Sequence, residues 1–210
     1  MAHDRRPVAE RGMTLIELIM TVALLSVVLA IFLSVLVSVQ NTVARQERRS
    51  RANERVRLAV QQLDREVRSG NVFRDPAAEP DDPVHGRVAG GMGLRIYTQA
   101  NADTRGGSRC VQWRITTDGK LQSRNWTVSW RTDGQVSGWR VVADGIVNPG
   151  GTPAFVLDSS PNFGGRILNL TFVVNPGAGD SDVVVQASIA GRNTQYGYPV
   201  SVCDDIPPSP

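Results

Sequence analysis

The residues Met13–Val39, MTLIELIMTVALLSVVLAIFLSVLVSV, decide the fold of this 210-residue chain. Glu17 is the only charged side chain among these 27 residues. As an α-helix that rises about 1.5 Å per residue, the segment would be roughly 40 Å long, which exceeds the hydrocarbon core of a bilayer, about 30 Å. We therefore expect residues 13–39 to form a membrane-spanning helix.

A cleaved secretory signal is the alternative interpretation of this segment, because Thr42-Val43-Ala44 could form a small-residue cleavage site. The apolar run is longer, however, than the about 7–15 residues of an ordinary signal peptide. The sequence therefore favours a segment that is retained.

The helix is expected to continue beyond the membrane. None of the 20 glycines and 12 prolines lies between Met13 and Ser69, and these two residue types are the strongest helix breakers. An uninterrupted helix over this range would be about 85 Å long, and Gly70 would end it. Residues 40–70 should form an amphipathic continuation in water, because apolar side chains recur there at helical spacing. They are Val56, Ala59, Val60, Leu63 and Val67.

The octapeptide Arg11-Gly12-Met13-Thr14-Leu15-Ile16-Glu17-Leu18, together with the apolar run after it, resembles the cleavage and methylation signature of type IV prepilins and type II secretion pseudopilins. The resemblance implies that residues 1–12 are a cytoplasmic leader, that a prepilin peptidase cuts between Gly12 and Met13, and that Met13 becomes N-methylated. Glycine before the cut bond lets an extended backbone approach a protease site closely. The expected partners are prepilin peptidase, other pilin or pseudopilin subunits, an inner-membrane assembly platform and the cytoplasmic membrane.

Glu17 needs a physical reason to lie in an apolar segment, because a carboxylate in hydrocarbon costs several kcal/mol unless it is neutralised or paired. It could simply reach the headgroups from its position near one end of the segment. The resemblance implies instead that Glu17 neutralises the N-terminal ammonium of a neighbouring subunit as helices pack into a filament. Breaking such a desolvated pair costs about 3–5 kcal/mol, so Glu17 is the expected filament-assembly charge.

The charge distribution and the resemblance disagree about orientation. The leader holds three arginines against two acids, whereas residues 40–51 hold four arginines against one acid. A positive-inside count would place residues 40–51 in the cytoplasm. The resemblance implies that the leader is inside and the head extracytoplasmic, and we follow the resemblance. Ser26 and Ser34 stand where many major pilins have glycine and proline, so melting of the helix midsection is not expected.

Residues 71–210 are expected to form a β-rich head. Residues 71–93 are rich in prolines, glycines and acids and predict a solvated loop. Farther on, Val111, Trp113 and Ile115 alternate with polar residues and predict a strand with one apolar face. Turn signals at Asp118-Gly119 and Asp133-Gly134 separate further runs. The predicted strands are Gly93–Gln99, Cys110–Thr117, Leu121–Trp130, Ser137–Ala143, Ala154–Leu157, Ile167–Val174 and Asp182–Ala190.

Such a sheet needs cover for its apolar face, and the helix stripe through Val56, Leu63 and Val67 is the nearest candidate. We therefore expect an α+β, pilin-like fold, in which the second half of a long N-terminal helix packs against a mostly antiparallel β-sheet head. The resemblance implies the same packing. Given the segment Leu63–Ser69 and the large head, the chain looks most like W-type minor pilins or J-type minor pseudopilins.

Cys110 and Cys203, with 92 residues between them, would most simply form one disulfide in an extracytoplasmic head, and two free buried thiols are the alternative. Asp180 and Asp182 could ligate calcium or belong to a polar hairpin tip. The four tryptophans are better explained by core or cross-strand packing than by a ligand platform. They are Trp113, Trp126, Trp130 and Trp139.

The net charge of +3 does not indicate a nucleic-acid surface. From residue 71 onward the chain carries 12 basic residues against 13 acidic ones, so direct nucleic-acid binding is not expected. The eight arginines of residues 40–70 should meet lipid headgroups and neighbouring acidic surfaces. His3, His85 and the two cysteines lack zinc-ligand spacing, and no nucleophile motif accompanies His85. We expect no enzyme, no cofactor and no metal.

The sequence thus favours a minor pilin or pseudopilin, a structural subunit of a type IV pilus or type II secretion-like filament that primes assembly or lies at the tip. Such a protein would be single-pass in the cytoplasmic membrane and would reach an extracellular or periplasmic filament after assembly. The alternative is a single-span, membrane-anchored extracytoplasmic binding protein or adhesin with an inert anchor.

Overall fold

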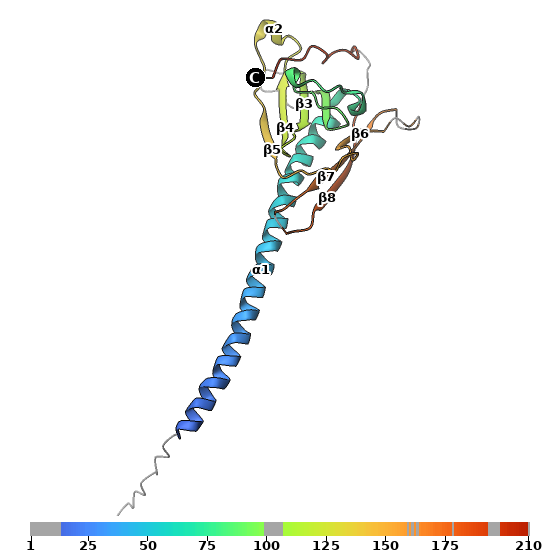
Figure 1. Cartoon of the computed structure of the whole chain (residues 1–210). Coiled ribbons are helices and arrows are strands. Elements are labelled where there is room, and N and C mark those ends of the chain that lie inside the picture. Colours follow the sequence, from blue (N-terminus) through green and yellow to red (C-terminus); the bar gives the residue numbers. More distant parts are fainter. Residues whose placement is uncertain are drawn as a thin grey trace, which may run out of the picture. The chain divides into compact units, whose positions relative to one another are not determined.

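The computed structural model describes residues 14–98, 107–158, 160, 162, 164–177, 179–192 and 198–209 (Figure 1). The chain divides into two compact units, Met1–Gln46 and Glu47–Pro210, and the helix α1, Leu15–Arg68, contributes to both. The elements after α1 are β1 Gly70–Phe73, the 3₁₀ helices η1 Pro76–Ala78 and η2 Pro83–His85, β2 Gly93–Thr98, β3 Arg109–Ile115, β4 Leu121–Trp126, α2 Trp130–Asp133, β5 Arg140–Ala143, β6 Phe155–Leu157, β7 Ile167–Val174 and β8 Val183–Ala190.

Helix α1 is unbroken, as the absence of glycine and proline predicts. Its residues up to 51 are all exposed, and the helix is long and apolar enough to cross a membrane. Three hydroxyl groups in its apolar part do not interrupt it, because each donates to a carbonyl three residues earlier in the same helix. These bonds join Thr21 to Leu18 at 2.8 Å, Ser26 to Ala23 at 2.7 Å and Ser34 to Ile31 at 2.7 Å.

The first sheet is an antiparallel meander in the order β1-β2-β3-β4-β5. Val111, Trp113 and Ile115 are buried on one face, which confirms the alternation predicted for β3. The turn between β3 and β4 needs glycine at position 119, where φ is 74°. A Cβ on Gly119 would also lie 2.5 Å from the carbonyl oxygen of Ile146.

The second sheet is antiparallel too, in the order β6-β7-β8. Strand β7 occupies its predicted range, and every second residue from Leu168 to Val174 is buried. An isolated bridge pairs Ile146 with Val174, and the backbone N–H of Val147 donates to the carbonyl of Val173 at 2.7 Å. The segment after β5 therefore links the two sheets.

One stripe of α1 packs against both sheets. Val56, Ala59, Leu63 and Val67 are fully buried, and burying a side chain of the size of valine or leucine contributes roughly 1.5–3 kcal/mol. The stripe that was expected to cover one sheet is confirmed, but it covers two. Its partners are Leu94, Ile96, Val111, Trp113, Ile115 and Leu121 of the first sheet, and Phe155, Leu168, Leu170, Phe172, Val174 and Ile189 of the second.

The solvated loop predicted at residues 71–93 is shorter in the structure, because residues 71–73 belong to a buried strand and Gly93 begins β2. Strand β1 begins at Gly70 and pairs with β2, and its residues are buried. The prolines and acids of this region build structure instead, because Asp75 and Asp82 cap η1 and η2 and a proline opens each of these helices. Gly70 itself starts β1, where a Cβ would lie 2.3 Å from the Phe73 ring.

Two other predicted strands are shorter in the structure. The strand predicted at Leu121–Trp130 ends at Trp126, and Trp130 begins α2. The strand predicted at Ser137–Ala143 begins at Arg140. The turn predicted at Asp133-Gly134 closes α2, where Gly134 takes the left-handed conformation with φ 65°.

A disulfide joins Cys110 of β3 to Cys203. It ties residues 203–209, which we call the C-terminal segment, to the face of the first sheet that points away from α1. A small second core forms there, and it contains Val72, Tyr97, Cys110, Trp126, Cys203 and Ile206. Of the two alternatives that the sequence left open, the structure therefore shows the disulfide.

We expect the double substitution Cys110→Ser, Cys203→Ser to lower the free energy of unfolding by about 4–5 kcal/mol, because the bond closes a loop with a sequence separation of 93 residues. Urea unfolding of the full chain in detergent, with and without reductant, measures the difference. The double variant should not respond to reductant, and equal stability of the oxidised and reduced wild-type chain would contradict the prediction.

Candidate functional site

Glu17 lies in the first turn of α1, where the backbone N–H groups lack intrahelical partners and the helix dipole favours a negative charge. Its neighbours Ile16 and Leu18 are 67% and 51% exposed. In residues 14–98 and the other described parts of the chain, no hydrogen bond or ion pair reaches its carboxylate. The predicted cleavage and methylation residues Gly12 and Met13 lie outside the described residues.

Glu66 is the second unusual carboxylate of α1, and it is fully buried. Its side chain accepts hydrogen bonds from the Trp113 indole N–H at 2.6 Å and from Gln62 at 3.0 Å. Its backbone carbonyl accepts a hydrogen bond from the Thr98 hydroxyl at 3.0 Å. A buried carboxylate needs such donors, so Glu66 sets the position of α1 on the first sheet through polar contacts.

Four of the eight arginines of residues 40–70 pair with acidic residues of their own chain, and two of these pairs reach acids outside α1. Arg48 pairs with Asp180 at 2.9 Å, and Arg55 pairs with Asp144 at 2.6 Å. Both pairs lie within the unit Glu47–Pro210. The Arg55–Asp144 pair is exposed on both sides and contributes about 0–1 kcal/mol, whereas the Asp180 side chain of the other pair is only 3% exposed.

The structure does not support the calcium site considered for Asp180 and Asp182. The Asp180 carboxylate accepts a hydrogen bond from Arg48, and Asp182 accepts one from the Asn175 side chain at 3.0 Å. Among the residues that the structure describes, no cluster of three or more histidine, cysteine, aspartate or glutamate side chains could hold a metal ion.

The tryptophans divide between core and surface. Trp113 and Trp126 are fully buried, as core packing predicts. Trp139 is half-buried, and the guanidinium carbons of Arg114 and Arg124 lie 3.8 and 4.6 Å from its ring centroid. These are cation–π contacts. The Trp139 ring therefore packs against arginines of its own chain.

The face of the first sheet that points away from α1 carries buried arginines. Arg95 of β2 and Arg124 of β4 flank Gln112 of β3 in register, and their exposed fractions are 6% and 1%. Arg124 donates to the Gln112 side chain at 2.9 Å. Buried guanidinium groups need acceptors for their N–H groups, so this face requires polar cover.

The C-terminal segment provides much of that cover. Arg124 donates to the carbonyls of Pro207 at 2.8 Å and Pro208 at 3.2 Å, and also to the carbonyl of His85 at 2.8 Å. Burial, together with the neighbouring cation of Arg114, lowers the pKa of Arg124 to about 10. The guanidinium therefore stays protonated at neutral pH, and backbone carbonyls stabilise its charge.

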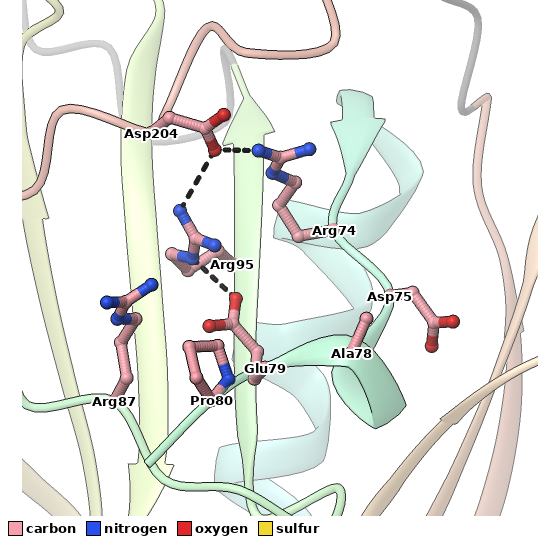
Figure 2. A pocket seen from close by; sticks show the side chains of 8 residues that line it. All are labelled: Arg74, Asp75, Ala78, Glu79, Pro80, Arg87, Arg95 and Asp204. Atoms are coloured by element: carbon pink, nitrogen blue, oxygen red, sulfur yellow. Dashed lines mark hydrogen bonds and ion pairs between the residues drawn. The ribbon is translucent and has the colours of Figure 1, made fainter. Parts of the chain in front are cut away.

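A pocket of about 370 Å³ lies beside β2, and we call it the arginine pocket (Figure 2). Arg95 donates to a Glu79 carboxylate oxygen at 2.5 Å and to the Cys203 carbonyl at 2.7 Å. Asp204 accepts from Arg95 at 3.4 Å and also pairs with Arg74. The Glu79 and Arg95 side chains are only 3% and 7% exposed. Asp75, Ala78, Pro80 and Arg87 complete the lining.

Several polar side-chain atoms of the residues that line the arginine pocket lack hydrogen-bond partners. Within the described residues, five buried side-chain nitrogen or oxygen atoms have no hydrogen-bond partner. Three of them belong to this pocket: Nε of Arg74, Nε of Arg87 and Oε2 of Glu79. Burial and then the nearby Arg95 cation lower the pKa of Arg74, while Glu79 acts in the opposite direction. The residues that line the pocket are therefore incompletely satisfied in hydrogen bonds, although each of its arginines pairs with an acid.

The sequence analysis did not single out Glu66, Glu79, Arg95 or Arg124. A signal existed for Glu66, which lies seven residues after Ala59 and therefore on the buried stripe of α1. The other three gave no local signal, because Arg95 meets Glu79 and Arg124 meets the C-terminal segment only after the sheet has formed.

Comparisons of the chain with protein-family models, with curated proteins and with solved structures found no significant match.

Asp82 controls the position of Arg87 at the arginine pocket. Its carboxylate accepts a hydrogen bond from Arg87 at 2.5 Å and lies 2.8 Å from Nδ1 of His85. The Arg87 and His85 hydrogen bonds hold the pKa of Asp82 well below its usual range. The ionised carboxylate therefore stabilises the folded chain above the pKa of an unfolded aspartate, about 3.9, and this contribution is lost as the pH falls toward the lower folded value.

We expect Asp82→Asn to lower the free energy of unfolding near neutral pH, and the difference from wild type to shrink below about pH 4. Urea unfolding over a pH series measures this. Asp81→Asn is the matched control, because Asp81 is exposed, and its effect should be small and independent of pH. A difference for Asp82→Asn that grows on acidification would contradict the prediction.

Proposed function

We propose that this chain is a minor pilin or pseudopilin, a structural subunit of a filament of the type IV pilus or type II secretion kind. In this proposal prepilin peptidase removes residues 1–12 and methylates Met13. The apolar part of α1 then passes from the cytoplasmic membrane into the filament, where the subunit primes assembly or lies at the tip. The observation that carries the proposal is Glu17, a lone carboxylate in an exposed, unbroken apolar helix.

Three other polar side chains of the apolar part of α1 have hydrogen-bond partners within the helix. The hydroxyl groups of Thr21, Ser26 and Ser34 each donate to a carbonyl of their own helix. The Glu17 carboxylate differs, since no described residue supplies it with a hydrogen bond or a counter-ion. In an apolar environment its partner has to come from another molecule.

The amino terminus that cleavage would create at Met13 has the opposite charge. Between staggered subunits this ammonium and the Glu17 carboxylate of a neighbour can be desolvated together, and loss of either partner leaves an uncompensated charge that costs about 3–5 kcal/mol. A helix that is apolar on all sides is stable only where lipid or other helices surround it. Filament assembly would provide both the surroundings and the counter-ion.

The head supports an extracytoplasmic and structural role. The Cys110–Cys203 disulfide fits an oxidising compartment. Nδ1 of His85 lies 2.8 Å from the Asp82 carboxylate, and no serine or cysteine side chain of the described residues forms a hydrogen bond with its imidazole ring. We therefore propose a subunit that acts by assembly and not by catalysis.

We expect Gly12→Leu to block processing, because a bulky side chain before the cut bond hinders approach of the backbone to the peptidase. Mass spectrometry of the purified native protein measures the outcome. The wild-type chain should begin with methylated Met13, whereas the variant should keep residues 1–12. A wild-type chain that begins elsewhere would contradict the proposal.

We expect Glu17→Gln to be processed normally but to enter filaments roughly two to four orders of magnitude less efficiently, from the loss of about 3–5 kcal/mol of pairing. Subunit content of sheared or purified filaments measures this. Ser34→Ala is the matched control, because it removes a hydroxyl group that serves only its own helix. Wild-type incorporation of Glu17→Gln would exclude the assembly role.

The same pair of variants tests the alternative of an anchored binding protein or adhesin. An inert anchor tolerates both Gly12→Leu and Glu17→Gln, because only its length and hydrophobicity matter. A filament subunit fails at processing with the first variant and at assembly with the second.

A further inference from the structure

We propose that the free edge of β8 binds an extended segment of another protein, which joins the second sheet as a fourth strand. The expected segment alternates polar side chains with apolar ones and carries one acidic residue on its apolar face. The inference concerns the head and does not depend on the proposed filament function.

Strand β8 ends the second sheet, whose order is β6-β7-β8 (Figure 1). Its eight residues, Val183–Ala190, pair with β7 in one continuous register without a bulge. They include no charged residue, no proline and no glycine. Natural edge strands are commonly protected from further pairing by charges, proline, bulges or short length. Strand β8 has none of these protections.

The other sheet edges are short or covered. Strands β1 and β5, at the ends of the first sheet, have four residues each, and Arg140 of β5 donates to the Gln62 side chain of α1 at 2.6 Å. Strand β6 has three residues, and its Phe155 N–H donates to the Gly91 carbonyl at 2.9 Å. Among the strands that the structure describes, β8 therefore offers the longest edge for pairing.

Alternate backbone groups of β8 point away from β7. The Gly191 N–H donates to the Arg166 carbonyl at 2.8 Å, in the register that continues the β7–β8 ladder. Backbone groups of successive residues alternate between the two sides of a strand, so the even-numbered residues of β8 face outward. They are all exposed, and in the part of the chain that the structure describes no hydrogen bond reaches their backbone groups. These residues are Val184, Gln186, Ser188 and Ala190.

A groove of about 460 Å³ lies between β8 and α1, and we call it the β8 groove. Val185 and Ala187 of β8 are partly buried against the core that includes α1. A strand added beside β8 would direct every second side chain to this same side of the sheet, and therefore into the β8 groove. An apolar side chain there would contact Val60, which is itself partly buried. The lining consists of Asn53, Arg57, Val60 and Gln61 of α1 and residues 184–187 of β8.

Arg57 sets the charge of the β8 groove. It is the one charged residue of the lining, it is exposed, and none of the ion pairs between described residues includes it. Four other arginines of residues 40–70 already pair with acids of their own chain. An acidic side chain on the added strand would supply the missing partner of Arg57.

A second copy of the chain fits the β8 groove less well than a segment of a different protein. Pairing of two β8 strands would bring the Arg57 side chains of both copies to one groove, and β8 contains no acid to neutralise them. Like charges at an interface oppose association. Charge complementarity therefore favours a partner segment that carries the acid.

The first experiment measures binding of a synthetic peptide to the full chain in detergent. The capped peptide TVTETVT presents valine and glutamate on one face and threonine on the other. Hydrogen–deuterium exchange with mass spectrometry locates the contact, because backbone amides that form hydrogen bonds exchange more slowly. We expect saturable protection of residues 183–190 and unchanged exchange in β5.

Methylation of the peptide amides tests whether backbone hydrogen bonds carry the binding. In an added strand, the N–H groups of alternate residues face β8 and the others face solvent. N-methylation of one alternate set should weaken binding roughly tenfold or more, because it removes donors and obstructs pairing, whereas N-methylation of the other set should have little effect. Equal effects of the two sets would contradict strand addition.

Two variants of the chain test the assigned groups. Gln186→Pro removes one outward N–H, and proline is tolerated on an edge strand where the N–H faces solvent. This variant should weaken peptide binding roughly tenfold, whereas the matched control Gln186→Thr keeps the N–H and should bind like wild type. Arg57→Gln should abolish the preference for TVTETVT over TVTQTVT, which we expect to be at most roughly fivefold for an exposed pair. Thermal unfolding verifies that each variant is folded.

The proposal is overturned if the peptide leaves the exchange of residues 183–190 unchanged, or if Gln186→Pro binds it as tightly as wild type does. It is also overturned if Arg57→Gln keeps the preference for the glutamate peptide. Light scattering tests the remaining occupant: a dimer of the wild-type chain that Gln186→Pro dissociates would mean that a second copy, and not another protein, pairs with β8.

Discussion

The packing of one helix stripe against two sheets is the constraint on which the head depends. Val56, Ala59, Leu63 and Val67 contribute to a single core with both sheets, so one helix stripe helps to cover the apolar faces of both. Glu66 lies on the same stripe and binds the Trp113 indole. A shift of the helix by one residue would remove both the apolar contacts and this hydrogen bond, because the stripe recurs at helical spacing.

The opposite face of the first sheet buries charged side chains and therefore needs polar cover. Its interior groups include Arg95 and Arg124, which apolar cover would leave without acceptors. The C-terminal segment meets this need with backbone carbonyls and Asp204, and the disulfide through Cys203 holds it there. The arginine pocket is the place where this cover is incomplete, because three buried polar atoms of its lining residues have no hydrogen-bond partner.

Two glutamates of α1 show how one helix serves two environments. Glu66 is buried in protein, and its carboxylate is satisfied by Trp113 and Gln62. Glu17 lies among exposed apolar side chains and finds no partner in the described residues. The same group thus has an internal structural role at one end of the helix, and at the other end its partner would come from a neighbouring subunit in the filament that we propose.

Local pattern was enough to predict the unbroken α1, the alternation of Val111, Trp113 and Ile115, and the range of β7, because each depends on spacing along a few turns of helix or residues of strand. It was not enough for β1, read as loop, or for the pair of Glu79 with Arg95, because these residues acquire their burial from strands and segments far away in the chain. It left the state of Cys110 and Cys203 open for the same reason. By itself the sequence determined the long helix, its apolar span and most of the strands, since those follow from periodicity and breakers. Only the tertiary structure decided which charged side chains are buried together. The shielding of a side chain from water depends on which distant segments pack over it.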